Sequence, residues 1–312
     1  MKSALLFPGQ GSQAIGMGKD LAENYSVSKQ VFDIVDEALG EKLSDLIWQG
    51  DLEELTLTRN VQPALMAASV AAYRAMLSEG FPETSSAYMA GHSLGEYSAL
   101  CAAGAISLED TARLLRLRGE AMQEAVKVGE GKMAAILGLE ISIVREIAEL
   151  ASKTGVCDIA NDNDPKQIVV SGSIESVGRA MEIAAEKGAR RVVELTVSAP
   201  FHCQLMNPAA ERMKEALENT EIRSPCIPIV ANVTAQPVID ADEIRSNLIK
   251  QVTATVRWHE SINHLSREQV TNAFELGSGN VLTGLVRRIN RNIKCVPVGN
   301  SQQVKSVLER MK

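Results

Sequence analysis

Cysteine is scarce in this sequence and shows no pairing pattern. Only five cysteines occur in 312 residues, and no two of them stand at the C-x-x-C spacing of a zinc or redox site. Their odd number and wide spacing argue against a disulfide framework, the usual support of small secreted proteins. We therefore expect free cysteines, a reducing compartment and no metal ion.

Long apolar runs and an excess of basic residues are also missing. The apolar run at the N-terminus, residues 4–7, is too short for the hydrophobic region of a signal peptide, and no stretch approaches the ~18 apolar residues of a membrane span. The chain carries 32 Lys and Arg against 39 Asp and Glu, a net charge of −7, so it lacks the basic footprint of a nucleic-acid-binding protein. We expect a cytoplasmic protein that binds neither membrane nor nucleic acid.

Apolar strands alternate with Ala-rich helices in the first part of the chain, which is typical of an α/β fold. Pro63 is expected in the first turn of one helix, and Ser107 at the N-cap of another. The strands are predicted over residues 4–7 and 87–90, and the helices over residues 62–77, 96–103 and 107–126.

The middle of the chain predicts a second unit. Its periodicities follow the order β-α-β-β-α-β, the split arrangement of a ferredoxin-like fold. We therefore divide the chain into a main domain of residues 1–127 and 198–312 and an inserted subdomain of residues 128–197. In the insertion, strands are predicted over 132–139, 156–160, 167–171 and 190–197, and helices over 142–153 and 174–187. Beyond it, strands are predicted over 228–232, 273–276 and 292–298, and helices over 208–219, 277–291 and 302–311.

Residues 91–95, with the sequence GHSLG, match the G-x-S-x-G pattern of a nucleophilic serine on a sharp strand-to-helix turn. Glycines on both sides relieve the crowding that such a turn creates, and the N–H group after the serine then points at the developing oxyanion. An apolar strand precedes the pattern and an Ala-rich helix follows it, as this turn requires. We predict that Ser93 is a nucleophile; a Gly-Ser turn that merely starts a helix is the alternative.

A nucleophilic serine needs a base, and the chain offers four histidines. His92 adjoins Ser93, and neighbouring side chains on such a turn diverge. His259 and His264 lie in a predicted surface helix, where we expect solvated or capping side chains. His202 lies in the loop where the chain re-enters the main domain, and clefts form at such junctions. We therefore predict that His202 is the base.

The third member of a catalytic triad stays open at this point. No carboxylate of the insertion stands out as the partner of the imidazole, and a backbone or amide carbonyl would serve equally, because the second ring N–H needs only an acceptor. The carboxylates considered are Asp158, Asp162, Asp164 and Glu194.

Three arginines follow the serine motif on one predicted helix. Arg113 and Arg116 share a face, and Arg118 is rotated from both. An arginine that faces a pocket would bind a carboxylate through two hydrogen bonds, but spacing alone does not choose among the three. Separately, two glycines around Gln10 let its backbone approach a ligand closely. This loop is a candidate second donor to an oxyanion, with an ordinary turn as the alternative.

Six motifs, read in order, resemble those of malonyl-CoA:acyl carrier protein transacylases. They are residues 7–13 (FPGQGSQ), 91–100 (GHSLGEYSAL), 116–119 (RLRG), 161–163 (NDN), 167–172 (QIVVSG) and 198–202 (SAPFH). The resemblance runs from about residue 3 to residue 290, and six motifs in one order are far more specific than any one alone.

The resemblance implies an α/β-hydrolase-like main domain with a parallel sheet and a ferredoxin-like insertion. It implies transfer of malonyl from malonyl-CoA to the phosphopantetheine thiol of acyl carrier protein through a malonyl-serine, supplying fatty-acid synthesis. Ser93 would be the nucleophile and His202 the general base, held by the main-chain carbonyl of Gln251 instead of an acid. We expect a monomer without a bound cofactor, with the coenzyme A thioester as substrate.

The remaining roles also come from the resemblance. The backbone N–H groups of Gln10 and Leu94 would bind the oxyanion, and Arg118 would pair with the malonyl carboxylate. Phe201 resembles the residue of members that prefer malonyl over bulkier branched acyl groups. Two positions depart from the family. Thr255 stands where proline is frequent, near the carbonyl of Gln251, and Gly277-Ser278-Gly279 stands where Gly-Pro-Gly is frequent.

Three other functions share some of these features. A serine hydrolase would use the same serine and base but needs no arginine and would release free malonate. A docking module that kept the fold would form no acyl-serine. A transacylase for a secondary-metabolite carrier protein is the nearest alternative. Basic groups that an acidic carrier protein would contact, or that are simply solvated helix ends, are Lys187, Arg190 and Arg191, and Arg287, Arg288 and Arg291.

Overall fold

The computed structural model of this chain describes residues 2–82, 86–127 and 129–311. Its strands are β1 (Ser3–Phe7), β2 (Ser86–Gly91), β3 (Gly131–Leu137), β4 (Cys157–Asp164), β5 (Gln167–Ser173), β6 (Arg191–Glu194), β7 (Ile229–Val230), β8 (Pro237–Val238), β9 (Asn272–Leu276) and β10 (Lys294–Val298). Its helices are α1 (Lys19–Asn24), α2 (Ser26–Leu39), α3 (Leu43–Gln49), α4 (Leu52–Thr56), α5 (Thr58–Ser78), α6 (Gly95–Ala102), α7 (Leu108–Glu124), α8 (Ile141–Ala151), α9 (Ile174–Glu186), α10 (Asn207–Glu218), α11 (Ala241–Gln251), α12 (Trp258–Arg267), α13 (Val281–Ile289) and α14 (Ser301–Met311).

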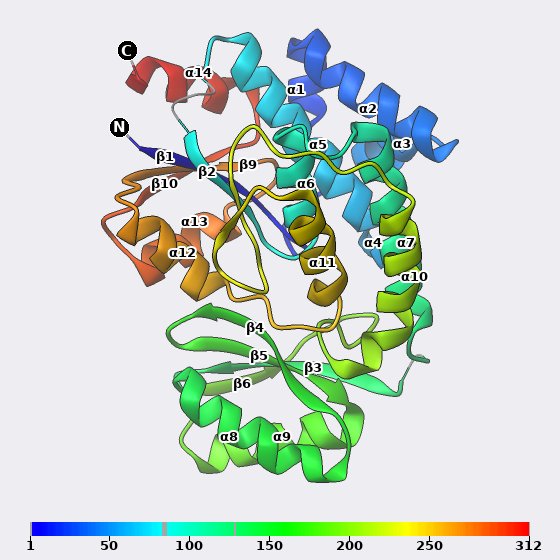
Figure 1. Cartoon of the computed structure of the whole chain (residues 1–312), viewed down its shortest axis with the longest axis vertical. Helices are drawn as coiled ribbons and strands as arrows, with labels where there is room; N and C mark the ends of the chain where they lie inside the picture. Colours follow the sequence, from blue (N-terminus) through cyan, green and yellow to red (C-terminus); the bar gives the residue numbers. More distant parts are fainter. Residues whose placement is uncertain (1, 83–85, 128, 312) are drawn as a thin grey trace.

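Two sheets organise the described residues (Figure 1). The larger sheet has the order β10-β9-β1-β2-β7-β8, and its neighbouring strands are parallel except for the antiparallel pair β7 and β8. The smaller sheet has the order β4-β5-β3-β6 and is antiparallel. The predicted α/β class, with a parallel main sheet and a second sheet, is confirmed in this form.

The larger sheet is buried on both faces, which explains the continuous apolar sequence of its central strand β1. Successive side chains of a strand point to opposite faces. Ala4 and Leu6 join an apolar cluster with residues of α12 and α13, whereas Leu5 and Phe7 join a larger cluster that includes α5. Helices therefore cover both faces and leave the carboxyl ends of β1 and β2 to form the site.

The smaller sheet uses the same alternation to join two cores. Ala134 and Ile136 of β3 pack with α8 and α9 in a cluster of their own. Met133 and Ala135 of the same strand belong to the main cluster. One face of this sheet is thus covered by α8 and α9, at the end of the molecule away from α1 and α2, and the other face packs on the rest of the chain (Figure 1).

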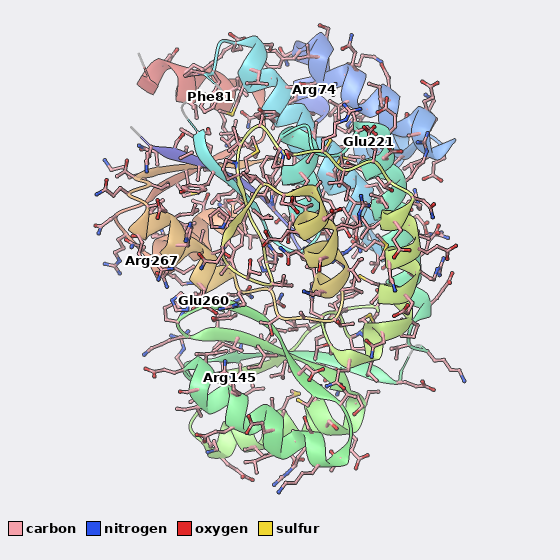
Figure 2. The ribbon with its side chains drawn as sticks, in the orientation of Figure 1. Arg74, Phe81, Arg145, Glu221, Glu260 and Arg267 are labelled. Carbon is pink, nitrogen blue, oxygen red and sulfur yellow. The ribbon has the colours of Figure 1, made fainter. Side chains whose placement is uncertain are left out.

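The end of β4 connects the smaller sheet to the segment after α11. Asn161 forms a parallel bridge with Val256, and the Thr255 hydroxyl donates a 2.6 Å hydrogen bond to the Ile159 carbonyl. Further along, Arg288 of α13 forms an ion pair with Asp164 (2.6 Å). Arg145 of α8 and Glu260 of α12 lie on opposite sides of this junction (Figure 2). The pKa of the Glu260 carboxyl is lowered mainly by its hydrogen bond with Arg257, and the charge of Arg145 adds a smaller effect in the same direction.

Most predicted elements are present, but several boundaries were wrong. The helix predicted from residue 62 begins at Thr58, so Pro63 lies inside α5 and not in its first turn. Gly277 and Gly279 have positive φ angles of 114° and 80°, which a right-handed helix excludes, and α13 begins only at Val281. The polar residues 161–164 extend β4 beyond its predicted end at residue 160, because they pair with β5.

The four helices α1 to α4 were not predicted, and neither was α11. The helix of His264 is amphipathic, and this residue is 8% exposed. Of the two alternatives expected for His264, a solvated or a capping side chain, the solvated one was therefore wrong. The predicted domain limits at residues 1, 128 and 312 fall on positions outside the described residues. Among the helices of the described part, none has both the length and the apolarity that a bilayer crossing requires.

Candidate active site

Ser93 lies at the sharp turn between β2 and α6. Its φ angle is 54°, a left-handed conformation that costs a non-glycine residue energy and recurs at functional sites. The Asn232 side-chain oxygen accepts the Ser93 N–H at 2.8 Å, and the Asn232 amide nitrogen donates to the Gly91 carbonyl at 2.6 Å. The turn is therefore held from outside the motif, in a conformation that presents the hydroxyl.

The glycines of the motif are required by close packing. A Cβ atom on Gly91 would lie 1.9 Å from the Gly95 carbonyl carbon, and one on Gly95 would lie 2.2 Å from the Phe7 carbonyl oxygen. Both contacts are with backbone, which cannot move aside without displacing β1 or α6. The small residues predicted from the motif are thus explained by the strand-to-helix geometry.

His202 lies between β6 and α10 and is 3% exposed. Its Nε2 is 2.8 Å from the Ser93 Oγ, and its Nδ1 is 2.8 Å from the backbone carbonyl oxygen of Gln251. Because a carbonyl only accepts, Nδ1 carries the proton and Nε2 presents its lone pair to the serine hydroxyl. The structure thus brings together the three residues predicted for proton transfer.

Burial lowers the pKa of His202 to about 3, and the positive charge of Arg118 acts in the same direction. The hydrogen bond to the Gln251 carbonyl opposes this shift, because it stabilises the protonated ring. The imidazole is therefore neutral at physiological pH, which is the form that can accept the serine proton.

Arg118 of α7 is 1% exposed, and it is the arginine that faces Ser93. One guanidinium nitrogen lies 3.2 Å from the Ser93 Oγ and 2.8 Å from the Gln251 side-chain oxygen, and the other lies 2.8 Å from the Gln62 side-chain oxygen. Desolvation lowers the pKa of Arg118, but arginine keeps its charge in proteins. The site therefore contains a buried cation beside the serine hydroxyl.

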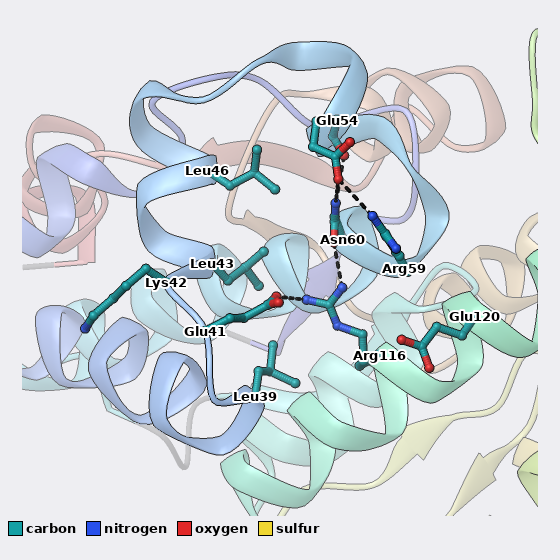
Figure 3. Close-up of a pocket in the computed structure, with 10 residues that line it drawn as sticks. All are labelled: Leu39, Glu41, Lys42, Leu43, Leu46, Glu54, Arg59, Asn60, Arg116 and Glu120. Atoms are coloured by element: carbon teal, nitrogen blue, oxygen red, sulfur yellow. Dashed lines mark hydrogen bonds and ion pairs between the residues drawn. The ribbon is translucent and has the colours of Figure 1, made fainter.

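The other two arginines point elsewhere. Arg116 forms an ion pair with Glu41, donates to Asn60 at 2.6 Å and lines a separate cavity of about 410 Å³ (Figure 3). Arg113 pairs with Asp110 at the surface (3.2 Å). Spacing alone did not choose which of the three arginines faces the site. In the structure it is Arg118, because its place on the helix turns it away from the directions of the other two.

Close contact between α5 and α7 brings Arg118 to its partners. A Cβ atom on Gly119 would lie 2.5 Å from the Thr58 carbonyl oxygen and 2.6 Å from the Arg59 Cα atom. The missing side chain of Gly119 lets the two helices touch at this level. As a result, the guanidinium of Arg118 reaches Gln62 across the interface.

A cavity of about 340 Å³ opens over Ser93 and His202. Gln10 and Leu94, the predicted oxyanion donors, both line it. Within the described residues, neither of their N–H groups donates a hydrogen bond, so both are available to a ligand. Other lining residues come from α5, α7, β3 and the loop after β6, and include Gln62, Met122, Met133, Leu195, Val197 and Phe201.

The remaining candidates do not join this centre as proton carriers. His92 lines the cavity, but its Nε2 is 2.8 Å from the Asn163 side-chain oxygen. His259 lies 3.7 Å from Asp162, and the His264 ring contacts Tyr88. The other carboxylates considered engage partners of their own: Asp158 with Gln204, Asp164 with Arg288, and Glu194 with Lys132.

Three residues of the site were missed in the sequence. Gln62, Asn232 and Glu96 are each at most 2% exposed and bond to the central residues. Amide and carboxylate side chains that belong to no recognised sequence motif give little indication of a functional role. Glu96 was visible only as the residue after the serine motif, and Gln62 as a polar residue in an Ala- and Met-rich helix.

Comparison with known proteins finds relatives that match nearly the whole chain. The acyl transferase domain pattern matches residues 4–292. The chain is 46% identical to the malonyl CoA-acyl carrier protein transacylase of Bacillus subtilis (strain 168), over 100% of this chain and 98% of that protein. It is 53% identical to the solved acyl-carrier-protein-S-malonyltransferase of Bartonella henselae, with a TM-score of 0.97 over 100% and 99% of the two chains. A malonyl-transacylase solved in complex with its type II PKS acyl-carrier protein is 40% identical, with a TM-score of 0.96 over 99% and 100%.

Proposed function

The chain belongs to the acyl transferase domain family, and from this premise we propose that it transfers malonyl from malonyl-CoA to acyl carrier protein. The acceptor is the phosphopantetheine thiol, the intermediate is a malonyl ester of Ser93, and the product supplies fatty-acid synthesis. One observation carries the proposal: Ser93 Oγ lies 2.8 Å from His202 Nε2 and 3.2 Å from the buried Arg118. A hydrolase has no need of that arginine.

In the first half-reaction, His202 Nε2 takes the Ser93 proton while Oγ attacks the thioester carbonyl of malonyl-CoA. The N–H groups of Gln10 and Leu94 stabilise the tetrahedral oxyanion, a contribution of about 10²–10³ in rate for one donor in comparable enzymes. The carbon–sulfur bond then breaks, and His202 returns the proton to the sulfur of coenzyme A. The Gln251 carbonyl holds the imidazole throughout and stabilises its protonated form.

The second half-reaction repeats these steps with another thiol. The phosphopantetheine thiol gives its proton to His202, and its sulfur attacks the carbonyl of the malonyl-serine. The carbon–oxygen bond breaks, His202 returns the proton to Ser93, and malonyl carrier protein leaves. Since a thioester is exchanged for a thioester, the overall transfer runs in both directions.

Arg118 selects the acyl group in this proposal. A malonyl carboxylate beside the guanidinium forms charge-assisted hydrogen bonds in a site that excludes water, and an acetyl group forms none. Phe201 lines the same cavity and limits the space for branched acyl groups. Malonyl-CoA and acyl carrier protein are therefore the two partners.

We propose the finer fold assignment on the same premise. An α/β-hydrolase-like main domain comprises residues 1–127 and 198–312, and a ferredoxin-like subdomain comprises residues 128–197. The strand order β4-β5-β3-β6, with α8 and α9 on one face, supports the second assignment. The cytoplasmic location, the monomeric state and the absence of a bound cofactor stay predictions.

Intact-mass measurement after incubation with malonyl-CoA tests the function. We expect wild type to gain one malonyl group and Ser93→Ala to gain none, and addition of holo acyl carrier protein should move the malonyl group onto the carrier. Rapid accumulation of free malonate would instead indicate a hydrolase. No adduct and no free malonate would indicate a docking module.

A further inference from the structure

Glu96 is a buried carboxylate that the mechanism above does not use. It is the second residue of α6 and is 2% exposed. Its Oε2 accepts hydrogen bonds from the Gln251 side-chain nitrogen at 2.7 Å and from the Asn232 backbone N–H at 3.1 Å. A carboxylate removed from water in this way is costly unless it is paired, so its position next to the site needs an explanation.

Gln251 connects Glu96 to Arg118. Its side-chain oxygen accepts from the Arg118 guanidinium at 2.8 Å, and its side-chain nitrogen donates to Glu96 and to the Ser93 carbonyl at 3.0 Å. A guanidinium only donates and an ionised carboxylate only accepts, so the amide has one orientation that satisfies both. A flipped amide would place N–H groups against the guanidinium and an oxygen against the carboxylate.

The charged groups follow the same order as these hydrogen bonds, with Arg118 and Glu96 on the two sides of the Gln251 amide. Within the described residues, no ion pair joins Arg118 directly to a carboxylate. Beside desolvation, Tyr97 and Glu96 act on its pKa, and Glu96 is the carboxylate of the two. The free site thus holds one buried cation and one buried anion separated by a single amide. A malonyl carboxylate adds a second anion to the same guanidinium.

We propose that Glu96 is a positioning residue for malonyl recognition, which fixes the Gln251 amide against Arg118 and weakens carboxylate binding when it is ionised. The inference rests on the proposed function. Ionised Glu96 competes with the malonyl carboxylate for the guanidinium, and protonated Glu96 does not. Malonyl-CoA therefore binds better when Glu96 is protonated, and its binding favours proton uptake.

The surroundings of Glu96 place this titration near neutral pH. Burial raises the pKa of Glu96 to about 7, against the opposing effects of Gln251, Asn232 and Arg118. Tyr97 of the same helix has a pKa raised to about 12, mainly by burial, so it stays neutral. The pKa of His202, about 3, is too low to titrate in the same range. Glu96 is thus the group of this network that changes charge there.

The test compares malonyl and acetyl loading of Ser93 from about pH 6 to about pH 8. Wild type, Glu96→Gln and Glu96→Ala are measured by quenched intact mass, with Glu109→Gln, an exposed glutamate of α7, as the matched control. Acetyl-CoA carries the same coenzyme without the acyl carboxylate, so pH effects on the coenzyme itself cancel.

For wild type and Glu109→Gln, we expect the KM for malonyl-CoA to rise by about tenfold across this range, while the KM for acetyl-CoA stays level. Glu96→Gln keeps the shape without the charge, so its malonyl KM should stay at the low-pH value. Glu96→Ala removes the acceptor, so its preference for malonyl over acetyl should fall. The proposal is overturned if Glu96→Gln retains the wild-type pH dependence, and this comparison decides even if Glu96→Ala does not fold. Failure of the proposed function would differ, because wild type itself would then form no malonyl-serine.

Discussion

The guanidinium of Arg118 is the single group with the largest expected effect on substrate choice. Replacing it in Arg118→Ala should remove the preference for malonyl-CoA over acetyl-CoA, a loss of about 2–5 kcal/mol in transition-state stabilisation for a desolvated charged contact. The ratio of kcat/KM for the two substrates measures it. Arg113→Ala, which removes an exposed arginine of the same helix, should leave the ratio unchanged; equal losses in both variants would contradict the role.

His202 should make acyl loading insensitive to moderate acid. Since the pKa of its imidazole is lowered to about 3, the ring remains a base well below its ordinary pKa of 6.5. We expect the rate of acetyl loading on Ser93 to stay level from about pH 8 down to about pH 5. A decline centred near pH 6.5 would show that the imidazole titrates normally.

The lowered pKa of His202 also makes the free energy of unfolding depend on pH. Between pH 6.5 and about 3, the unfolded chain binds a proton that folded His202 does not, so the free energy of unfolding decreases as the pH falls through this range. Glu96 acts in the opposite direction, because its pKa is raised from 4.5 to about 7: its contribution decreases as the pH rises through that range. Urea unfolding of Glu96→Gln should lack this second dependence and so gain on wild type by about 3 kcal/mol towards neutral pH.

Among the site residues, the sequence predicted those that lie in a local pattern or next to a predicted strand. Ser93 lies in a local pattern, and His202 follows a strand at a domain junction, so both were predicted from the residues themselves. Arg118 and Gln251 came only from the family resemblance, because their contacts join helices far apart in the chain. Glu96 was missed, since its role depends on an amide 155 residues away.

Among the secondary-structure elements, the contact of α5 with α7 controls how Arg118 meets Gln62. Gly119→Ala would place a methyl group 2.5 Å from the Thr58 carbonyl oxygen, so we expect destabilisation of about 1–3 kcal/mol from overpacking. The helices would also separate, and the preference for malonyl should fall. Thermal unfolding and the malonyl-to-acetyl ratio report the two effects.

Gly178→Ala provides the control for that change. Gly178 lies inside α9, and apart from its chain neighbours and the nearby backbone of its own helix no atom lies within 4 Å of its added Cβ. Alanine there should stabilise the protein by about 0.5–1 kcal/mol and leave selectivity alone. If both glycine variants behaved alike, packing at Gly119 would not be the cause.

Several elements with strong periodicity were predicted, but α2 was missed although it is 14 residues long and buries Val31, Phe32 and Val35 at helical spacing. β1 is an uninterrupted apolar run, and α7 has a serine cap and acids in its first turn. By contrast, α3 and α4 are 7 and 5 residues long, too short for a periodic signal. β4 continues through Asn161–Asp164 only because β5 and Val256 supply partners.

For the molecule as a whole, the junction between the two sheets supports the site. Thr255, where the family frequently has proline, bonds to the Ile159 carbonyl of β4 at 2.6 Å, four residues after Gln251. Thr255→Val keeps the shape but removes this bond, so we expect a loss of about 1 kcal/mol in stability. Because the Gln251 carbonyl would be held less firmly, kcat should decrease more than KM changes. Unchanged kcat with lowered stability would limit Thr255 to a structural role.

Gln251 performs its two tasks with two different parts of one residue. The side-chain amide meets Arg118, and the backbone carbonyl meets His202. A codon change can remove the first but not the second, because every amino acid supplies the same carbonyl. A mutational scan would therefore score Gln251 by its amide alone, and the group that orients the base would stay invisible to genetics.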